Sequence, residues 1–184
     1  MTATTPRKSR TALWTAIAVG VVLALLVAVL ATRDPASTRL AKSPLVGKGV
    51  PALSAQTVDG SSTYDIDDHQ GEWVLVNFFA TWCIPCQEEH DDLVRFAEAY
   101  TGQASVVSVV FSDQAEDVRR FFERRGGDWP VLRDDDARIA TDFGVARVPE
   151  SYLVAPNGTV YGKVLGGVTF EFLQEELAKV GVTA

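Results

Sequence analysis

The sequence predicts an α/β domain with a mixed β-sheet flanked by helices, preceded by one transmembrane helix. Two continuous apolar runs, Trp73–Phe79 and Ala104–Phe111, have the length of strands that are buried on both faces. A helical pattern separates them, which predicts a parallel pair with a right-handed crossover. Further along, a Pro156-Asn157-Gly158 turn between two short apolar runs predicts an antiparallel hairpin in the same sheet.

The N-terminal segment has the composition of a membrane-spanning helix. No residue from Thr11 to Thr32 is charged, and a helix of this length reaches about 33 Å, enough for a hydrocarbon layer of about 30 Å. Three basic residues precede it and no acidic one, so the positive-inside rule places residues 1–10 in the cytoplasm and the C-terminal domain outside. A cleaved signal peptide ending near Val29-Leu30-Ala31 is an alternative, although its apolar region would be unusually long. A buried core helix is the third interpretation.

Charge and cysteine content exclude several functions for the residues that follow this segment. Residues 33–45 are polar with two prolines and are predicted to form a tether to a domain at residues 46–184. Residues 34–184 contain 13 basic and 24 acidic residues, a net charge of −11, which argues against nucleic acid as a partner. Two cysteines are too few for a disulfide-stapled scaffold or a four-cysteine zinc site.

The remaining elements follow from local patterns. Asp59-Gly60 predicts the turn of a small hairpin before the first buried strand. Apolar residues spaced three and four apart predict three helices, and a further short helix near residues 136–143 is predicted to end at Gly144. The three apolar faces consist of Leu93, Phe96, Ala97 and Tyr100; of Val118, Phe121 and Phe122; and of Phe170, Leu173, Leu177 and Val180.

The two cysteines lie in the motif Trp82-Cys83-Ile84-Pro85-Cys86, between a buried strand and an amphipathic helix. The helix N-terminus offers unpaired N–H groups and the positive end of the helix dipole, which favour a thiolate at Cys83. Pro85 suits the first helical turn, where an N–H group has no partner to lose. We therefore expect Cys83 to attack a substrate disulfide and Cys86 to resolve the mixed disulfide.

Other uses of the cysteine pair stay open at this point. A static structural disulfide is one, although so short a loop closes little chain entropy. Zinc would need two more ligands, and His69 and His90, which we expect at the surface, lack the usual paired spacing. Copper capture by the thiols is another use, whereas Gln87 excludes the Cys-x-x-Cys-His pattern of haem attachment. We expect no metal site, and no cofactor beyond a redox-active Cys83–Cys86 disulfide.

The run from Val76 to Cys86, VNFFATWCIPC, resembles the active-site stretch of membrane-anchored thioredoxin-like proteins of the TlpA, ResA and CcmG/DsbE group. The resemblance extends from about Val46 to the C-terminus and includes the run VPESYLV at residues 148–154. It implies a thioredoxin-like fold with an N-terminal hairpin and a central strand–helix insert. It also implies an extracytoplasmic thiol:disulfide oxidoreductase, and many members of the group reduce apocytochrome c before haem attachment. The anchor and the Pro149-Glu150 pair resemble the CcmG/DsbE branch most.

The resemblance also implies a substrate-binding surface. Pro149 matches the cis-proline that faces the cysteine pair and helps to bind the substrate chain; otherwise it is an ordinary strand-initiating proline. Glu150 is expected to line the same groove or, alternatively, to be an acid at a strand edge. Trp82 is expected to shield the thiols and offer a flat contact surface. Pro85 and Val148 complete the expected surface.

Glu89, three residues after Cys86, matches a glutamate that is common in the group. A carboxylate at this position would raise the pKa of a nearby thiol and could relay a proton, whereas the alternative is a solvated acid on the helix face. Two departures from related patterns bear on this role. Asn77 stands where thioredoxins carry a buried aspartate, so no proton relay is expected there, and Asp91 stands where the group often has a helix-kinking proline.

The leading hypothesis is a membrane-tethered thiol:disulfide reductant that acts on the periplasmic or cell-envelope side, with apocytochrome c as the expected protein substrate. An oxidising compartment would keep the cysteine pair oxidised, so the hypothesis requires a membrane thiol protein as electron donor. The tether would raise the effective concentration of the domain near its partners. Two alternatives stay open: an oxidase or isomerase that forms disulfides in exported proteins, and a non-catalytic metal-delivery module that uses the thiols as ligands.

Overall fold

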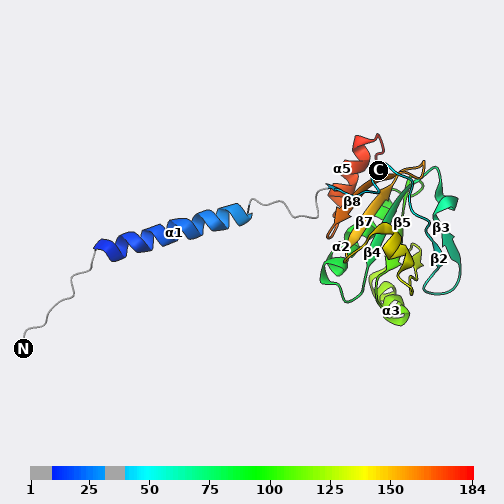
Figure 1. Ribbon diagram of the computed structural model, residues 1–184, viewed down its shortest axis with the longest axis horizontal. Coiled ribbons are helices and arrows are strands. Elements are labelled where there is room, and N and C mark those ends of the chain that lie inside the picture. Colours follow the sequence, from blue (N-terminus) through cyan, green and yellow to red (C-terminus); the bar gives the residue numbers. More distant parts are fainter. Residues whose placement is uncertain (1–9, 32–39) are drawn as a thin grey trace, which may run out of the picture. The chain divides into compact units, whose positions relative to one another are not determined.

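The computed structural model describes residues 10–31 and 40–184, and the chain divides into two compact units, Met1–Pro35 and Ala36–Ala184. The described residues of the N-terminal unit form the helix α1 (Arg10–Ala31), which coincides with the predicted helical segment to within one residue at each end (Figure 1). Among the residues described, no helix meets the combined length and hydropathy of a membrane span. The placement of residues 11–32 in a membrane therefore stays a prediction.

The C-terminal unit is built on one mixed sheet of six strands. In chain order the strands are β1 (Leu40–Ala41), β4 (Trp73–Phe79), β5 (Ala104–Val110), β6 (Val131–Leu132), β7 (Glu150–Val154) and β8 (Val160–Leu165). Their order across the sheet is β1-β8-β7-β4-β5-β6. β4 pairs with β5 in parallel and with β7 antiparallel, which confirms the predicted crossover unit and the predicted hairpin of β7 and β8.

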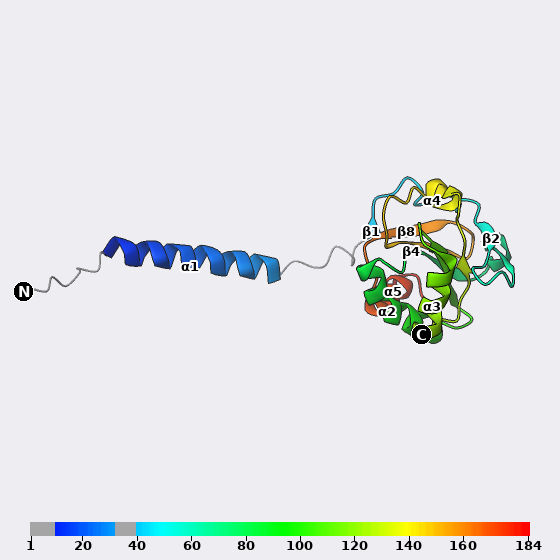
Figure 2. The same cartoon turned by 90° about the horizontal axis from the view of Figure 1, so that it is seen from below.

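Helices cover both faces of this sheet, as the continuous apolar runs require. Figure 2 shows α2 (Ile84–Ala99), α3 (Ala115–Arg125) and α5 (Phe170–Lys179) on one face and α4 (Arg138–Phe143) on the other. All seven residues of β4 are consequently buried. We refer to these two sides as the α2 face and the α4 face.

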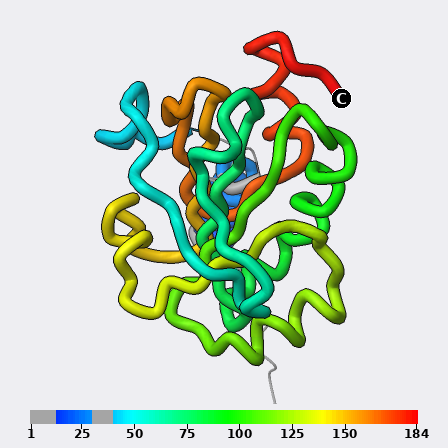
Figure 3. Tube along the Cα trace, turned by 90° about the vertical axis from the view of Figure 1, so that its right-hand side faces the viewer, coloured from blue at the N-terminus to red at the C-terminus, as the bar shows by residue number. Residues whose placement is uncertain are grey.

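A second sheet is the predicted small hairpin, β2 (Ser54–Gln56) and β3 (Thr63–Asp65), whose strands run side by side in Figure 3. The turn includes Gly60, which has a positive φ of 71°, as a tight hairpin turn requires. A short 3-10 helix, η2 (Ile66–His69), follows the hairpin. Tyr64 and Ile66 join the hydrophobic cluster of the α4 face, so the hairpin is fixed to the main sheet.

The predicted tether is too long at its C-terminal end. Leu40 and Ala41 pair with β8 as an edge strand, so the folded domain begins before residue 46. The Leu40 side chain packs closely on Gly162 of β8, since a Cβ atom on Gly162 would lie 2.6 Å from Leu40 Cδ2. Residues 32–39, which contain most of the rest of the predicted tether, lie outside the described part of the chain.

Two hydrophobic clusters lie on the α2 face, with a polar row between them. One cluster includes Leu75 of β4 and packs against α5, and the other includes Phe79 together with both cysteines. Between these two residues along β4 lies Asn77, whose direct partners are Ser108 on β5 and Ser151 on β7. Directly paired residues point to the same face of a sheet, so the three polar side chains form one row beneath α2.

Candidate functional site

Cys83 and Cys86 lie at the start of α2, where the sequence motif predicts them. Cys83 is the N-cap residue, and its Sγ accepts a hydrogen bond from the backbone N–H of Cys86 at 3.2 Å. The two residues form a disulfide with Cα atoms 5.2 Å apart, and their exposed fractions are 5% and 3%. In the reduced state, the helix N-terminus and this N–H would stabilise a thiolate at Cys83, which is the species that attacks a disulfide.

Exposed apolar side chains surround the buried sulfur atoms. Trp82 is 59% exposed and Ile84 is 66% exposed, and Pro85 is also at the surface. The loop before Cys83 is held in place, because Trp82 Nε1 donates to the carbonyl of Ser112 at 3.1 Å. Large apolar groups held in fixed positions at the surface provide area for binding another protein.

Pro149 lies beside the cysteine motif. The Val148–Pro149 peptide bond is cis, which confirms the expectation from the resemblance. Phe78 on β4 pairs with Glu150 on β7, so Pro149 lies level with the end of β4, from which the chain continues into the motif. Val148 packs against the hydrophobic cluster that contains both cysteines. The structure therefore brings the cysteine pair, Val148 and Pro149 together.

The side chain of Glu150 is not in this groove. Side chains alternate along β7, and that of Glu150 points to the α4 face, away from the cysteines. Its Oε2 lies 2.7 Å from Nζ of Lys163, and both side chains are buried. Burial lowers the pKa of Lys163, but the hydrogen bonds that its ammonium donates to Glu150 and Tyr152 outweigh this effect, and the net direction is upward. The expected groove position and the strand-edge alternative are both wrong for this carboxylate, which forms a buried ion pair.

Glu89 is buried beneath the start of α2, with 3% of its surface exposed. Its Oε1 accepts a hydrogen bond from Asn77 Nδ2 at 2.9 Å, and its Oε2 accepts one from the backbone N–H of Val168 at 2.7 Å. Burial raises its pKa from 4.5 to about 7; the two hydrogen bonds pull it down, and Asp92 pushes it up. The solvated alternative is therefore wrong, and an acid that can hold or release a proton near neutral pH lies one helical turn after Cys86.

The polar row that holds Glu89 was not predicted as part of the site. Asn77 Nδ2 also donates to Ser151 Oγ at 3.1 Å, and Ser108 Oγ donates to Asn77 Oδ1 at 3.4 Å. The Asn77 amide does not titrate, but it donates a hydrogen bond to the Glu89 carboxyl group, which does. The sequence contains a signal for this row, since Asn77 is the single polar residue of the apolar run WVLVNFF and Ser108 interrupts the valines of ASVVSVV.

His90 is buried, so its predicted surface position is wrong. Its side chain points from α2 toward α3, and Nε2 lies 2.9 Å from the carbonyl oxygen of Gly126. Burial lowers the pKa of His90, the largest effect on this group. The aromatic rings around it are those of Phe121, Phe122 and Trp129. Among the described residues, no group of three or more His, Cys, Asp or Glu side chains is arranged to hold a metal ion.

The sequence pattern of the AhpC/TSA family matches residues 46–163. The chain belongs to the AhpC/TSA family. The chain is also similar to the thiol:disulfide interchange protein CycY of Rhizobium leguminosarum bv. viciae. The two are 37% identical over 109 residues, which cover 59% of this chain and 58% of the relative. The thiol:disulfide interchange protein DsbE of Pseudomonas fluorescens biotype C is 30% identical over 161 residues, which cover 85% of this chain and 87% of the relative.

A solved structure shows the same fold. The thiol:disulfide interchange protein of Chlorobium tepidum TLS, a thioredoxin family protein, matches with a TM-score of 0.66 at 24% identity, covering 76% of this chain and 98% of that one. Within the AhpC/TSA family, the chain is a thiol:disulfide oxidoreductase of the TlpA/ResA/CcmG group, as the sequence resemblance implies.

Proposed function

We propose that this chain is a membrane-tethered reductant that acts outside the cytoplasm and keeps the haem-binding cysteines of apocytochrome c reduced. The observation that supports this proposal best is the combination of the Cys83–Cys86 pair at the N-terminus of α2 with a buried acid, Glu89, one turn further along. A cis-proline, Pro149, beside the pair completes a site suited to an extended substrate chain.

The reaction begins with both cysteines reduced. The Cys83 thiolate attacks one sulfur of the substrate disulfide, the substrate S–S bond breaks, and the departing substrate sulfur takes up a proton. Cys86 then loses its proton, and we assign the Glu89 carboxylate, one helical turn further along α2, as the acceptor. The Cys86 thiolate attacks Cys83 in the mixed disulfide, which releases the second substrate sulfur as a thiol. Two electrons have passed to the substrate, and the Cys83–Cys86 disulfide remains.

A further cycle requires a dithiol donor that reduces the Cys83–Cys86 disulfide by the same steps in reverse. In an oxidising compartment no glutathione pool supplies these electrons, so we propose a membrane thiol protein as the donor. The uncharged segment at residues 11–32, with basic residues before it, supports a membrane tether with the domain outside. A tether would keep the domain close to a donor in the same membrane.

Deletion of the gene in the source organism tests the proposal. We expect a loss of holocytochrome c, measured by haem staining, that the wild-type gene restores and that Cys83→Ser and Cys86→Ser do not. Glu123→Gln, which changes an exposed acid on α3, is the matched control and should restore the cytochrome. A small-molecule thiol in the medium should also restore it. Unchanged holocytochrome c in the deletion strain grown without added thiol would remove apocytochrome c as the substrate.

A further inference from the structure

The polar row beneath α2 continues beyond the sheet to Trp129. This residue lies between α3 and β6, and its indole Nε1 donates to Ser108 Oγ at 2.9 Å. Ser108 in turn contacts Asn77, and Asn77 contacts Glu89. Hydrogen bonds therefore connect Glu89 to a residue on the far side of β5, 40 positions later in the chain.

The donor and acceptor groups of these side chains fix the direction of each hydrogen bond in the series. An indole N–H can only donate, so Ser108 Oγ accepts from Trp129 and its own hydrogen is directed to Asn77 Oδ1. With Oδ1 occupied by a donor, the amide NH2 of Asn77 faces the other way, toward Glu89 and Ser151. A rotated amide would instead present Oδ1 to Glu89, where a carboxylate is repelled and a protonated acid is bound.

We propose that Trp129 and Ser108 are positioning residues for Glu89, because they hold the Asn77 amide in the orientation that stabilises the Glu89 carboxylate. This inference rests on the proposed function, in which that carboxylate accepts the proton of Cys86. It gives Trp129, a residue that does not belong to the cysteine motif, control over when the second step of the exchange can occur.

Few groups around Glu89 can stabilise its negative charge, so the hydrogen bond from Asn77 is one of the main sources of that stabilisation. The sheet contributes only the neutral side chains of Asn77 and its row, and the segment before α5 contributes the backbone N–H of Val168. On α2 itself, Asp92 opposes ionisation of Glu89 by charge repulsion. Among the described residues, no lysine, arginine or histidine forms an ion pair with this carboxylate, so the two N–H donors carry the stabilisation of its charge.

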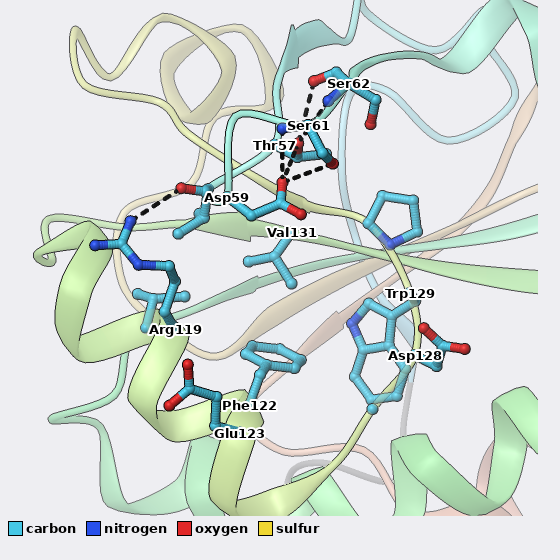
Figure 4. A pocket seen from close by; sticks show the side chains of 14 residues that line it. Thr57, Asp59, Ser61, Ser62, Arg119, Phe122, Glu123, Asp128, Trp129 and Val131 are labelled. Atoms are coloured by element: carbon cyan, nitrogen blue, oxygen red, sulfur yellow. Dashed lines mark hydrogen bonds between the residues drawn. The ribbon is translucent and has the colours of Figure 1, made fainter.

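The outer edge of Trp129 reaches a surface cleft, which allows it to be changed without touching the cysteines. The cleft has a volume of about 470 Å³ and lies between the turn of the small hairpin, α3 and residues 127–131. Figure 4 shows Trp129 and Phe122 on its wall, with Arg119 and Glu123 of α3 nearby. Trp129→Phe keeps an aromatic ring in this wall and removes the N–H donor together with the five-membered ring of the indole; the matched change Trp73→Phe has the same loss of ring volume.

The test is a carbon-13 NMR titration of the Glu89 carboxyl group in the oxidised full-length chain in detergent, with the signal assigned from Glu89→Gln. We expect Trp129→Phe and Ser108→Ala each to raise the midpoint by about 0.5 pH unit, which corresponds to one weakened hydrogen bond to a carboxylate. The double variant should move little further, because both changes break the same chain. Trp73→Phe, a matched change at a buried tryptophan on β4, should leave the midpoint unchanged.

Two results would overturn the inference. One is an unchanged midpoint in both single variants. The other is a shift in Trp129→Phe alone, because the effect would then come from the neighbouring His90, whose ring lies 5.5 Å from that of Trp129. The titration is done on the oxidised protein and needs no substrate. Normal reductase activity with an unmoved midpoint would therefore refute only this inference, and a moved midpoint without cytochrome c activity would refute only the proposed function.

Discussion

Replacing Glu89 by Gln should change how the stability of the domain depends on pH. Burial raises the pKa of Glu89 from 4.5 to about 7, so the native protein binds this proton more tightly than the unfolded chain. The free energy of unfolding of the wild type therefore falls as the pH rises from about 4.5 to about 7, by about 3 kcal/mol in total. Below this range both states are protonated, and above it both are ionised.

Glutamine keeps the shape of the side chain and removes the titration. It also loses one of two hydrogen bonds, because its NH2 group would face the NH2 group of Asn77, and this costs about 1 kcal/mol at every pH. We expect Glu89→Gln to be less stable than the wild type near pH 4.5 and more stable above pH 7, with the difference between the two proteins changing by about 3 kcal/mol.

Urea denaturation of the two oxidised proteins, followed by tryptophan fluorescence from about pH 4 to about pH 8, measures this difference. His69, His90 and every other titrating group are common to both proteins and cancel in the comparison. A difference in stability that stays constant over this range would refute the reasoning, since it would mean that Glu89 titrates at the same pH in the native and unfolded states.

Three further predictions concern the rest of the domain. Cys83→Ser should abolish disulfide reduction, whereas Cys86→Ser should accumulate mixed disulfides with substrate that mass spectrometry detects; equal behaviour of the two variants would contradict the assigned order of attack. Glu150→Gln should lower the free energy of unfolding by about 3 kcal/mol because it leaves Lys163 buried without its partner, and a loss below about 1 kcal/mol would be inconsistent with a buried pair. Asp134→Ala should cost about 1 kcal/mol, because its carboxylate accepts the first free N–H groups of α4 at 2.9 and 2.8 Å; Asp135→Ala, an exposed neighbour, is the control and should cost almost nothing.

The long apolar runs made the central fold predictable. Trp73–Phe79 has the same bounds as β4, because seven consecutive apolar or uncharged residues suit only a strand covered on both sides. The edge strand β1 was missed for the opposite reason. Its two residues carry no periodicity, and the strand they pair with, β8, lies more than 100 residues away in the chain.

The site was predictable where chemistry depends on neighbours in sequence. Cys83, Cys86 and the helix that begins between them follow from one motif, and Pro149 follows from a resemblance carried by adjacent residues. The orientation of acidic side chains was not predictable in this way. Glu89 and Glu150 are both buried. Glu89 accepts a hydrogen bond from Asn77, 12 residues earlier, and Glu150 forms an ion pair with Lys163, 13 residues later. No local pattern distinguishes these two residues from solvated acids.

The reduction potential of the Cys83–Cys86 pair in the full-length protein tests the central claim most directly. Equilibration against thiol buffers of known potential, with the reduced fraction measured by alkylation, gives this value. The account predicts a potential at or below about −220 mV, in the range of glutaredoxins and thioredoxin, as expected for a reductant that depends on a membrane electron donor. A potential near about −120 mV would contradict it and identify the protein as an oxidant that forms disulfides in its substrates.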